Sequence, residues 1–134
     1  MRPSAKLIAL AFAGGALGTL ARYGVGLAAN WVLAVVLVNL LGAAFLGMAN
    51  GLGARPGNHF STDGARAFWG VGFAGGFTTM SGLAGVFVAL NLVGLTVLSA
   101  VFMVGQLVLG VLVYLAALKL ATGKPAATNL GQAE

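Results

Sequence analysis

Long apolar runs alternate with short polar breaks along this chain. A hydrocarbon core of about 30 Å needs roughly 20 helical residues. Four runs reach that length: residues 7–29, 31–52, 67–90 and 93–121. The connections near Asn30 and Asn91 are tight, which makes neighbouring helices antiparallel. The pattern predicts an all-α integral membrane fold with four transmembrane helices, in a single domain over residues 1–121, and a disordered C-terminal tail at 122–134.

The composition supports a membrane protein. Hydrophobic residues make up 60% of the chain and charged residues only 7%, whereas about a quarter of a soluble domain is charged. There is no cysteine, which excludes disulfides and thiolate metal sites. The single histidine, His59, lies in the polar connection 53–66 without a second ligand at metal spacing. We therefore interpret it as a solvated loop residue.

Basic residues are concentrated on one side of the predicted membrane domain. Four spans place the N-terminus, the connection 53–66 and the C-terminus together. That side carries six of the seven basic residues: Arg2, Lys6, Arg55, Arg66, Lys119 and Lys124. They are too scattered for a nucleic-acid surface. The bias predicts a single orientation in a bacterial-type plasma (inner) membrane, with both termini cytoplasmic.

The first span is expected to be retained, because no clear signal cleavage site follows it.

The third apolar run is interrupted by glycines and hydroxyls. Gly75-Gly76 favour a third helix that is broken at mid-membrane, and Thr78, Thr79 and Ser81 follow. The hydroxyls can bond back to helical carbonyls, which is their usual fate in membrane helices. Alternatively, freed main-chain groups there can serve an ion, because lipid offers them no partners.

Two further polar residues lie inside apolar spans. Asn39 is suited either to an interhelical hydrogen bond or to donating its amide protons to a solute. Arg22 either snorkels to the membrane surface or lines an electropositive vestibule.

Carboxylates are absent from all four spans, since Asp63 lies in the connection and Glu134 is the last residue. This excludes a proton-coupled drug antiporter of the small multidrug-resistance type. It also leaves no general acid or base, so we do not expect an enzyme.

Glycine patterns add little specific chemistry. Residues 70–75 match G-x-G-x-x-G but follow no strand and lie inside a span, so a dinucleotide site is rejected. The G-x-x-x-G pairs at 14–18 and 47–51 indicate close helix packing, and a dimer is the simplest partner for them.

Three segments together resemble the Fluc (CrcB-type) fluoride channels. They are residues 14–23 (GGALGTLARY), 38–47 (VNLLGAAFLG) and 72–79 (GFAGGFTT). The resemblance implies passive fluoride export by an antiparallel dimer of four-helix subunits with two pores. It implies pore-lining roles for Asn39, Thr79 and Ser81, and a vestibule position for Arg22. It also implies a structural sodium ion at the dimer centre, held by the carbonyls of Gly75 and Thr78.

The chain departs from the pattern of that family after Thr79. Met80 and Leu83 stand where two pore-lining phenylalanines are typical, and Gly82 replaces a hydroxyl. The acidic residue expected near 85–86 is missing. A subunit with one fixed orientation also cannot pair antiparallel with itself. We therefore expect a heterodimer with a second, oppositely inserted family member, and the alternative is a non-conducting scaffold or regulatory subunit.

Overall fold

A computed structural model describes residues 4–123 of the chain. Every element in this range is helical. In chain order the elements are α1 (Ala5–Ala28), α2 (Trp31–Gly53), η1 (His59–Ser61), α3 (Asp63–Ala65), η2 (Arg66–Ala74), α4 (Gly75–Phe77), α5 (Met80–Leu92) and α6 (Thr96–Thr122). The segment η2 is a π-helix, which is wider than an α-helix and rare at this length.

Four helical stretches are long and apolar enough to cross a membrane by length and composition: Ala5–Ala28, Trp31–Gly53, Asp63–Leu92 and Thr96–Thr122. The prediction of an all-α chain with four spanning helices is therefore confirmed.

The ends of the later spans differ from the prediction. The third stretch begins at Asp63, earlier than expected, because the Thr62 hydroxyl accepts a hydrogen bond from the Ala65 N–H and caps the helix. The fourth begins at Thr96, since Gly94 adopts a φ of 80° that ends the preceding turn. The sequence predicts Thr122 in the C-terminal tail, but it is the last residue of α6. The tail prediction from residue 124 onward lies outside the described residues.

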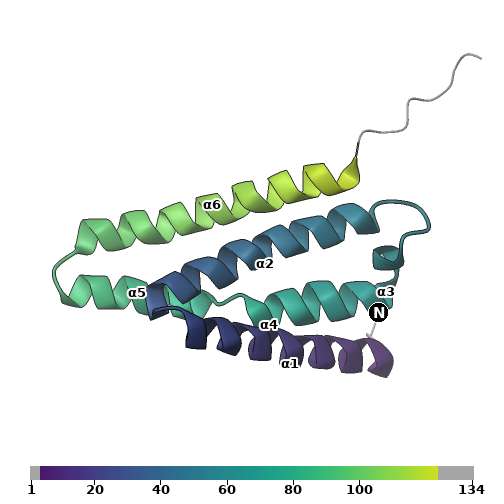
Figure 1. The fold of residues 1–134 in the computed structure, drawn as a ribbon, viewed down its shortest axis with the longest axis horizontal. Coiled ribbons are helices and arrows are strands. Elements are labelled where there is room, and N and C mark those ends of the chain that lie inside the picture. Colours follow the sequence, from purple (N-terminus) through teal and green to yellow (C-terminus); the bar gives the residue numbers. More distant parts are fainter. Residues whose placement is uncertain (1–3, 124–134) are drawn as a thin grey trace, which may run out of the picture.

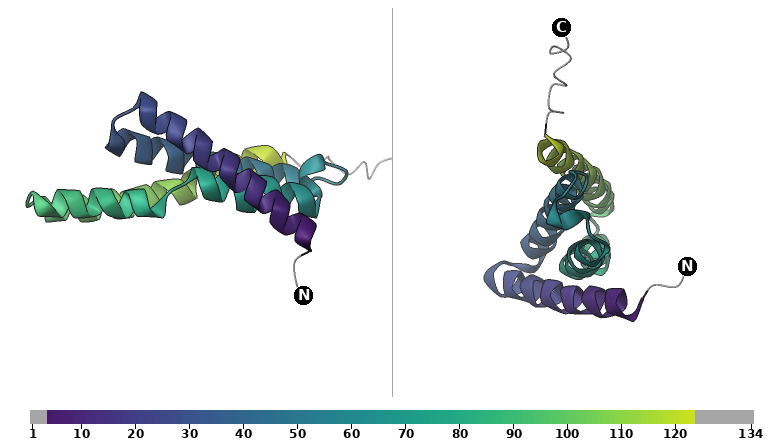
Figure 2. Two further views of the ribbon diagram at one scale, coloured as in Figure 1. Left: turned by 90° about the horizontal axis from the view of Figure 1, so that it is seen from below. Right: turned by 90° about the vertical axis from the view of Figure 1, so that its right-hand side faces the viewer.

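Spanning helices that follow one another in the chain run antiparallel. Helix α2 therefore lies beside α6 and parallel to it, and the third stretch, which runs parallel to α1, lies between α2 and α1 (Figure 1). Both ends of the described chain and the connection from α2 to α3 lie at the same end of the molecule (Figure 1). Helix α1 crosses the third stretch obliquely, as the two rotated views show (Figure 2).

Small residues allow α1 to approach the third stretch closely. Four glycines have a main-chain atom of the opposite helix where a Cβ would stand: Gly14, Gly18, Gly72 and Gly76. A Cβ on Gly14 would overlap the carbonyl oxygen of Phe68, and one on Gly72 would overlap that of Ala11. The two helices thus interlock through reciprocal glycine pairs, each spaced four residues apart.

Glycines also join α2 to α6. A Cβ on Gly47 would overlap the carbonyl oxygen of Tyr114, and one on Gly51 would overlap the side chain of Ala121. Both G-x-x-x-G pairs singled out in the sequence therefore pack within one chain. They give no support to the dimer for which they were the first argument.

Candidate functional site

The third stretch stops being helical at two residues. Helix α4 ends at Phe77 and α5 begins at Met80. Between them the main chain is extended, with φ and ψ of −76° and 160° at Thr78 and of −145° and 111° at Thr79. Extended residues between two helices leave main-chain donors and acceptors without helical partners. The candidate site consists of the side chains that form hydrogen bonds with these main-chain groups.

Asn39 of α2 satisfies the main chain of Thr79 with both polar atoms of its side chain. The Thr79 N–H donates to Asn39 Oδ1 at 2.7 Å, and Asn39 Nδ2 donates to the Thr79 carbonyl at 3.1 Å. The interhelical role considered for this residue is therefore present in the structure. An amide nitrogen carries two protons, so one remains to donate elsewhere.

Arg22 of α1 reaches the other extended residue. Its Nη1 donates to the carbonyl oxygen of Thr78 at 3.1 Å, and the side chain is half-buried. The guanidinium is therefore directed to the interruption in the third stretch. It brings a positive charge to this point.

The three hydroxyls near the interruption make different hydrogen bonds. Thr78 Oγ1 donates back to the carbonyl of Ala74 at 2.9 Å, as hydroxyls commonly do in apolar helices. Thr79 Oγ1 accepts from the Gly82 N–H at 2.9 Å and so caps α5. Thr79 Oγ1 and Ser81 Oγ lie 3.1 Å apart and share a hydrogen bond.

One groove, which we name the Asn39 groove, lies between α2, the interruption and α6. Its volume is about 360 Å³. It brings together five of the predicted pore-lining or ion-binding residues: Asn39, Thr78, Thr79, Met80 and Leu83. Most of its remaining wall is apolar, including Leu46, Leu107 and Val111 from α2 and α6.

A second groove, the Arg22 groove, lies toward α1 and has a volume of about 370 Å³. Arg22 and Ser81 line it, together with Trp31 at the start of α2. Thr79 lines both grooves. The extended residues thus place the two grooves close together, one with an amide donor and one with a guanidinium.

The two residues that replace the expected phenylalanines differ in their surroundings. Met80 is 57% exposed and stands open to the Asn39 groove. Leu83 touches the same groove but is only 1% exposed, because it packs with Val35 and Val86 in the buried core of the chain.

The resemblance to the fluoride channels implies a sodium ion at the carbonyls of Gly75 and Thr78. The Thr79 N–H bonds to Asn39, so it does not return to the Gly75 carbonyl as it would in a continuous helix. Gly75 is exposed, and nothing lies within 4 Å of where its Cβ would be. The Thr78 carbonyl, however, already accepts from Arg22, whose charge opposes a second cation. Hard cations need several oxygen ligands, so one chain alone is an incomplete site for sodium.

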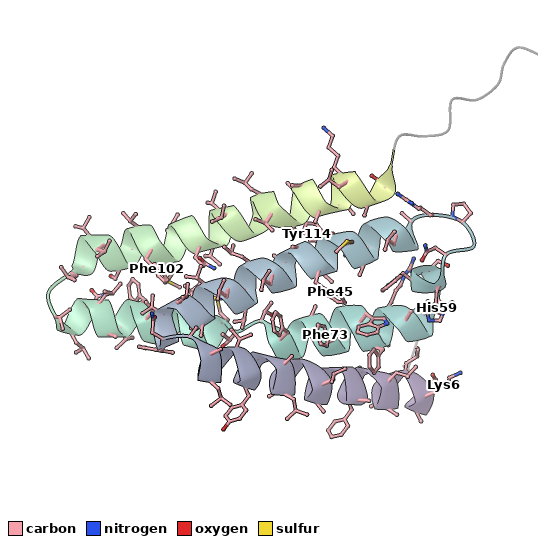
Figure 3. All side chains as sticks on the ribbon, in the orientation of Figure 1. Lys6, Phe45, His59, Phe73, Phe102 and Tyr114 are labelled. Carbon is pink, nitrogen blue, oxygen red and sulfur yellow. The ribbon has the colours of Figure 1, made fainter. Side chains whose placement is uncertain are left out.

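Two residues of the Asn39 groove were missed in the sequence. Gln106 of α6 is 8% exposed, and its Nε2 donates to the Val36 carbonyl at 3.4 Å. Tyr114 lies on the side of α6 that faces α2 (Figure 3), where its hydroxyl accepts from Asn50 Nδ2 at 3.1 Å. Gln106 is a single amide in an apolar span, which is the same signal that identified Asn39.

Comparison with known proteins places the chain in a family. A family model described as "CrcB-like protein, Camphor Resistance (CrcB)" matches residues 9–118. A Thermus thermophilus protein named "Fluoride-specific ion channel FluC" is 38% identical over 108 residues, which cover 74% of this chain and 80% of the relative. A Caulobacter protein of the same name is 43% identical, covering 57% of this chain and 62% of the relative. A Thermobifida fusca protein named "Fluoride-specific ion channel FluC 2" is 45% identical, covering 56% and 58%.

No solved structure matches the chain. The family match extends from within α1 to within α6 and therefore includes the whole interrupted region with Arg22, Asn39 and Thr79. Together with the four apolar helices, it shows a multi-pass membrane protein. The chain belongs to the CrcB-like family.

Proposed function

We propose that this chain is a subunit of a fluoride channel that allows passive fluoride export across the membrane. The observation that carries the proposal is the junction at Thr78 and Thr79, where α1 contributes Arg22 and α2 contributes Asn39 to one non-helical point. Non-helical main chain within a membrane span is tolerated only where protein or a water-lined cavity surrounds it. The names of the relatives supply the identity of the ion.

The chemistry of the two grooves suits a small anion. Removing a small, strongly hydrated ion from water is costly unless donors replace the lost water. Asn39 retains one amide proton at the Asn39 groove, and Gln106 has a second proton there beyond its long bond to Val36. Arg22 raises the local anion concentration from the neighbouring groove. Among residues 4–123, no carboxylate that would repel the anion lines either groove.

A second subunit completes the pore in this proposal. Both grooves are open on the surface of one chain, so this chain does not enclose a conduction path. The basic residues described at one end, Lys6, Arg55, Arg66 and Lys119, favour one orientation with both termini in the cytoplasm. An antiparallel partner would then have to be a different family member with the opposite bias. Its Gly75 and Thr78 equivalents would provide the carbonyls that a sodium ion at the subunit boundary needs.

The alternative is a non-conducting scaffold or regulatory subunit that keeps the fold of the channel. The position of Leu83 favours it, because that side chain is used in the core of the chain and offers no aromatic edge to an anion. Met80 likewise provides a thioether where a positive ring edge would attract fluoride.

Fluoride efflux from liposomes separates these possibilities. Proteoliposomes would hold this chain alone, a second family member from the same genome alone, or both together, and released fluoride would be followed with a selective electrode. A channel subunit of a heterodimer gives efflux only when both chains are present. Chloride-loaded liposomes serve as the control for leakage.

Robust efflux from this chain alone would contradict the heterodimer and leave a homodimeric channel. Co-purification of the two chains without any efflux would favour the scaffold. Efflux from the partner alone, at the same rate as from the pair, would remove this chain from the conduction path.

A further inference from the structure

A groove away from the interruption lies between α1 and the start of the third stretch, and we name it the α1–η2 groove. Its volume is about 480 Å³. Leu7, Ile8 and Ala11 line it from α1. Ala67 and Val71 line it from η2, and Asp63 and Arg66 complete it. None of these residues lines the Asn39 groove or the Arg22 groove.

The lining of this groove changes from charged to apolar along the helices. Asp63 and Arg66 belong to the first turns of the third stretch, at the end of the molecule where Lys6 and His59 also lie (Figure 3). Ala67 and Val71 follow toward the middle of the stretch, and Val71 is 73% exposed. Ile8 on the facing helix is 57% exposed. A charged mouth at the membrane surface above an apolar floor is the arrangement that suits a phospholipid.

The two charges at the mouth have opposite signs. Asp63 and Arg66 are three residues apart in a helical segment, so their side chains leave the helix on one face, with about 5–6 Å between Cβ atoms in an α-helix. An arginine fork matches a phosphate oxygen pair, and a carboxylate accepts from an ammonium group. In phosphoethanolamine, a two-carbon chain separates the phosphate from the ammonium group. Asp63 and Arg66 are close enough together for one such headgroup to contact both side chains.

We propose that the α1–η2 groove binds phosphatidylethanolamine, with its phosphate on Arg66, its ammonium on Asp63 and the start of its acyl chains on the apolar floor. The two opposite charges of Asp63 and Arg66 determine which lipid headgroup should bind most tightly. An anionic lipid without an ammonium group leaves Asp63 unpaired beside a negative phosphate. A phosphatidylcholine headgroup has no N–H to donate to the carboxylate. This site is independent of the proposed channel function and of the second subunit.

Lipid binding to the purified, delipidated protein tests this proposal. Native mass spectrometry in detergent would compare phosphatidylethanolamine, phosphatidylglycerol and phosphatidylcholine of identical acyl chains at equal concentration. The wild-type chain should retain phosphatidylethanolamine with about tenfold higher affinity than either other lipid, the effect of one charge-assisted hydrogen bond. Asp63→Asn should remove this preference, and Arg66→Gln should weaken binding of all three phospholipids.

Lys119→Gln is the matched control, because Lys119 is a basic residue near the end of α6 that does not line the groove. It should leave the lipid preference unchanged. Ala67→Phe keeps both charges but fills the groove, and it should reduce binding of all three lipids. The melting temperature of each variant verifies its fold.

Equal retention of the three lipids by the wild-type chain would overturn the proposal. So would a preference for phosphatidylglycerol, or a preference for phosphatidylethanolamine that persists in Asp63→Asn. If Asp63→Asn fails to fold, the response of Ala67→Phe decides, since binding unaffected by a filled groove places the lipid elsewhere.

Discussion

The side chain of Asn39 pairs with the main chain of Thr79 across 40 residues of sequence, through one accepted hydrogen bond of 2.7 Å and one donated bond of 3.1 Å. This pairing replaces the helical partners that Thr79 lacks. It therefore holds the non-helical residues in place and also fixes where the remaining amide proton of Asn39 points.

Asn39→Ala should consequently affect both stability and conduction. Losing the amide leaves the part-buried N–H and carbonyl of Thr79 without these partners, and about 1–3 kcal/mol each is the upper limit of the cost, reached when such groups are fully buried. We expect a lower unfolding temperature in detergent and a fall of fluoride efflux by at least about tenfold, the equivalent of 1.4 kcal/mol. Asn91→Ala is the control, because Asn91 also bonds within the chain, to Phe87 and Ser99, but lines neither groove. Unchanged efflux in Asn39→Ala, in a chain that still folds, would remove this residue from the conduction path.

Arg22 should act through its charge as well as through its bond to Thr78. We expect Arg22→Gln to lower fluoride efflux several-fold at low ionic strength and Arg22→Lys to retain more of it, because a lysine keeps the positive charge. The difference between the two variants should shrink at high salt, where exposed charges are screened within a few ångströms. Equal losses in both variants at every salt concentration would show that only the geometry of the guanidinium matters.

The reciprocal glycines of α1 and the third stretch give a stability prediction. Gly14→Ala and Gly72→Ala each place a Cβ onto a carbonyl oxygen of the opposite helix. Overpacking of this kind costs about 1–3 kcal/mol, so both variants should unfold at lower temperature in detergent. Gly24→Ala is the control on the same helix, since nothing lies within 4 Å of its added Cβ. Its stability should be unchanged or slightly raised. If all three variants unfold at the same temperature, α1 does not pack on the third stretch in this way.

The apolar runs predicted the four spans well, because the thickness of a membrane sets their length. Which residues interrupt the third run depends instead on contacts between residues that are distant in the sequence. Gly75-Gly76 drew attention to the third run, yet both glycines are helical in α4, and the extended residues are Thr78 and Thr79. The position of the extended residues depends on their contacts with Asn39 and Arg22. These two residues lie far from the third run in the sequence, so the pattern of the run itself does not predict the contacts.

The glycine pairs show the same limit. A G-x-x-x-G pattern predicts a close approach between helices but does not identify the partner. Gly14 meets Phe68 of its own chain, so the contact needed no second subunit. The π-helix η2 had no signal in the sequence at all, because its wider turn is not distinguished by the composition or period of residues 66–74.

Met80 provides the sharpest test of conduction by this chain. Its side chain is 57% exposed in the Asn39 groove, so a phenylalanine fits there without displacing core residues. Met80→Phe supplies a ring edge with partial positive charge beside Asn39. If the grooves conduct fluoride, the variant should raise efflux of the reconstituted pair, and Met48→Phe should not, because Met48 is similarly exposed on α2 but lines neither groove. An unchanged rate in Met80→Phe, with both chains still associated, would mean that fluoride passes through the partner alone, as the scaffold interpretation requires.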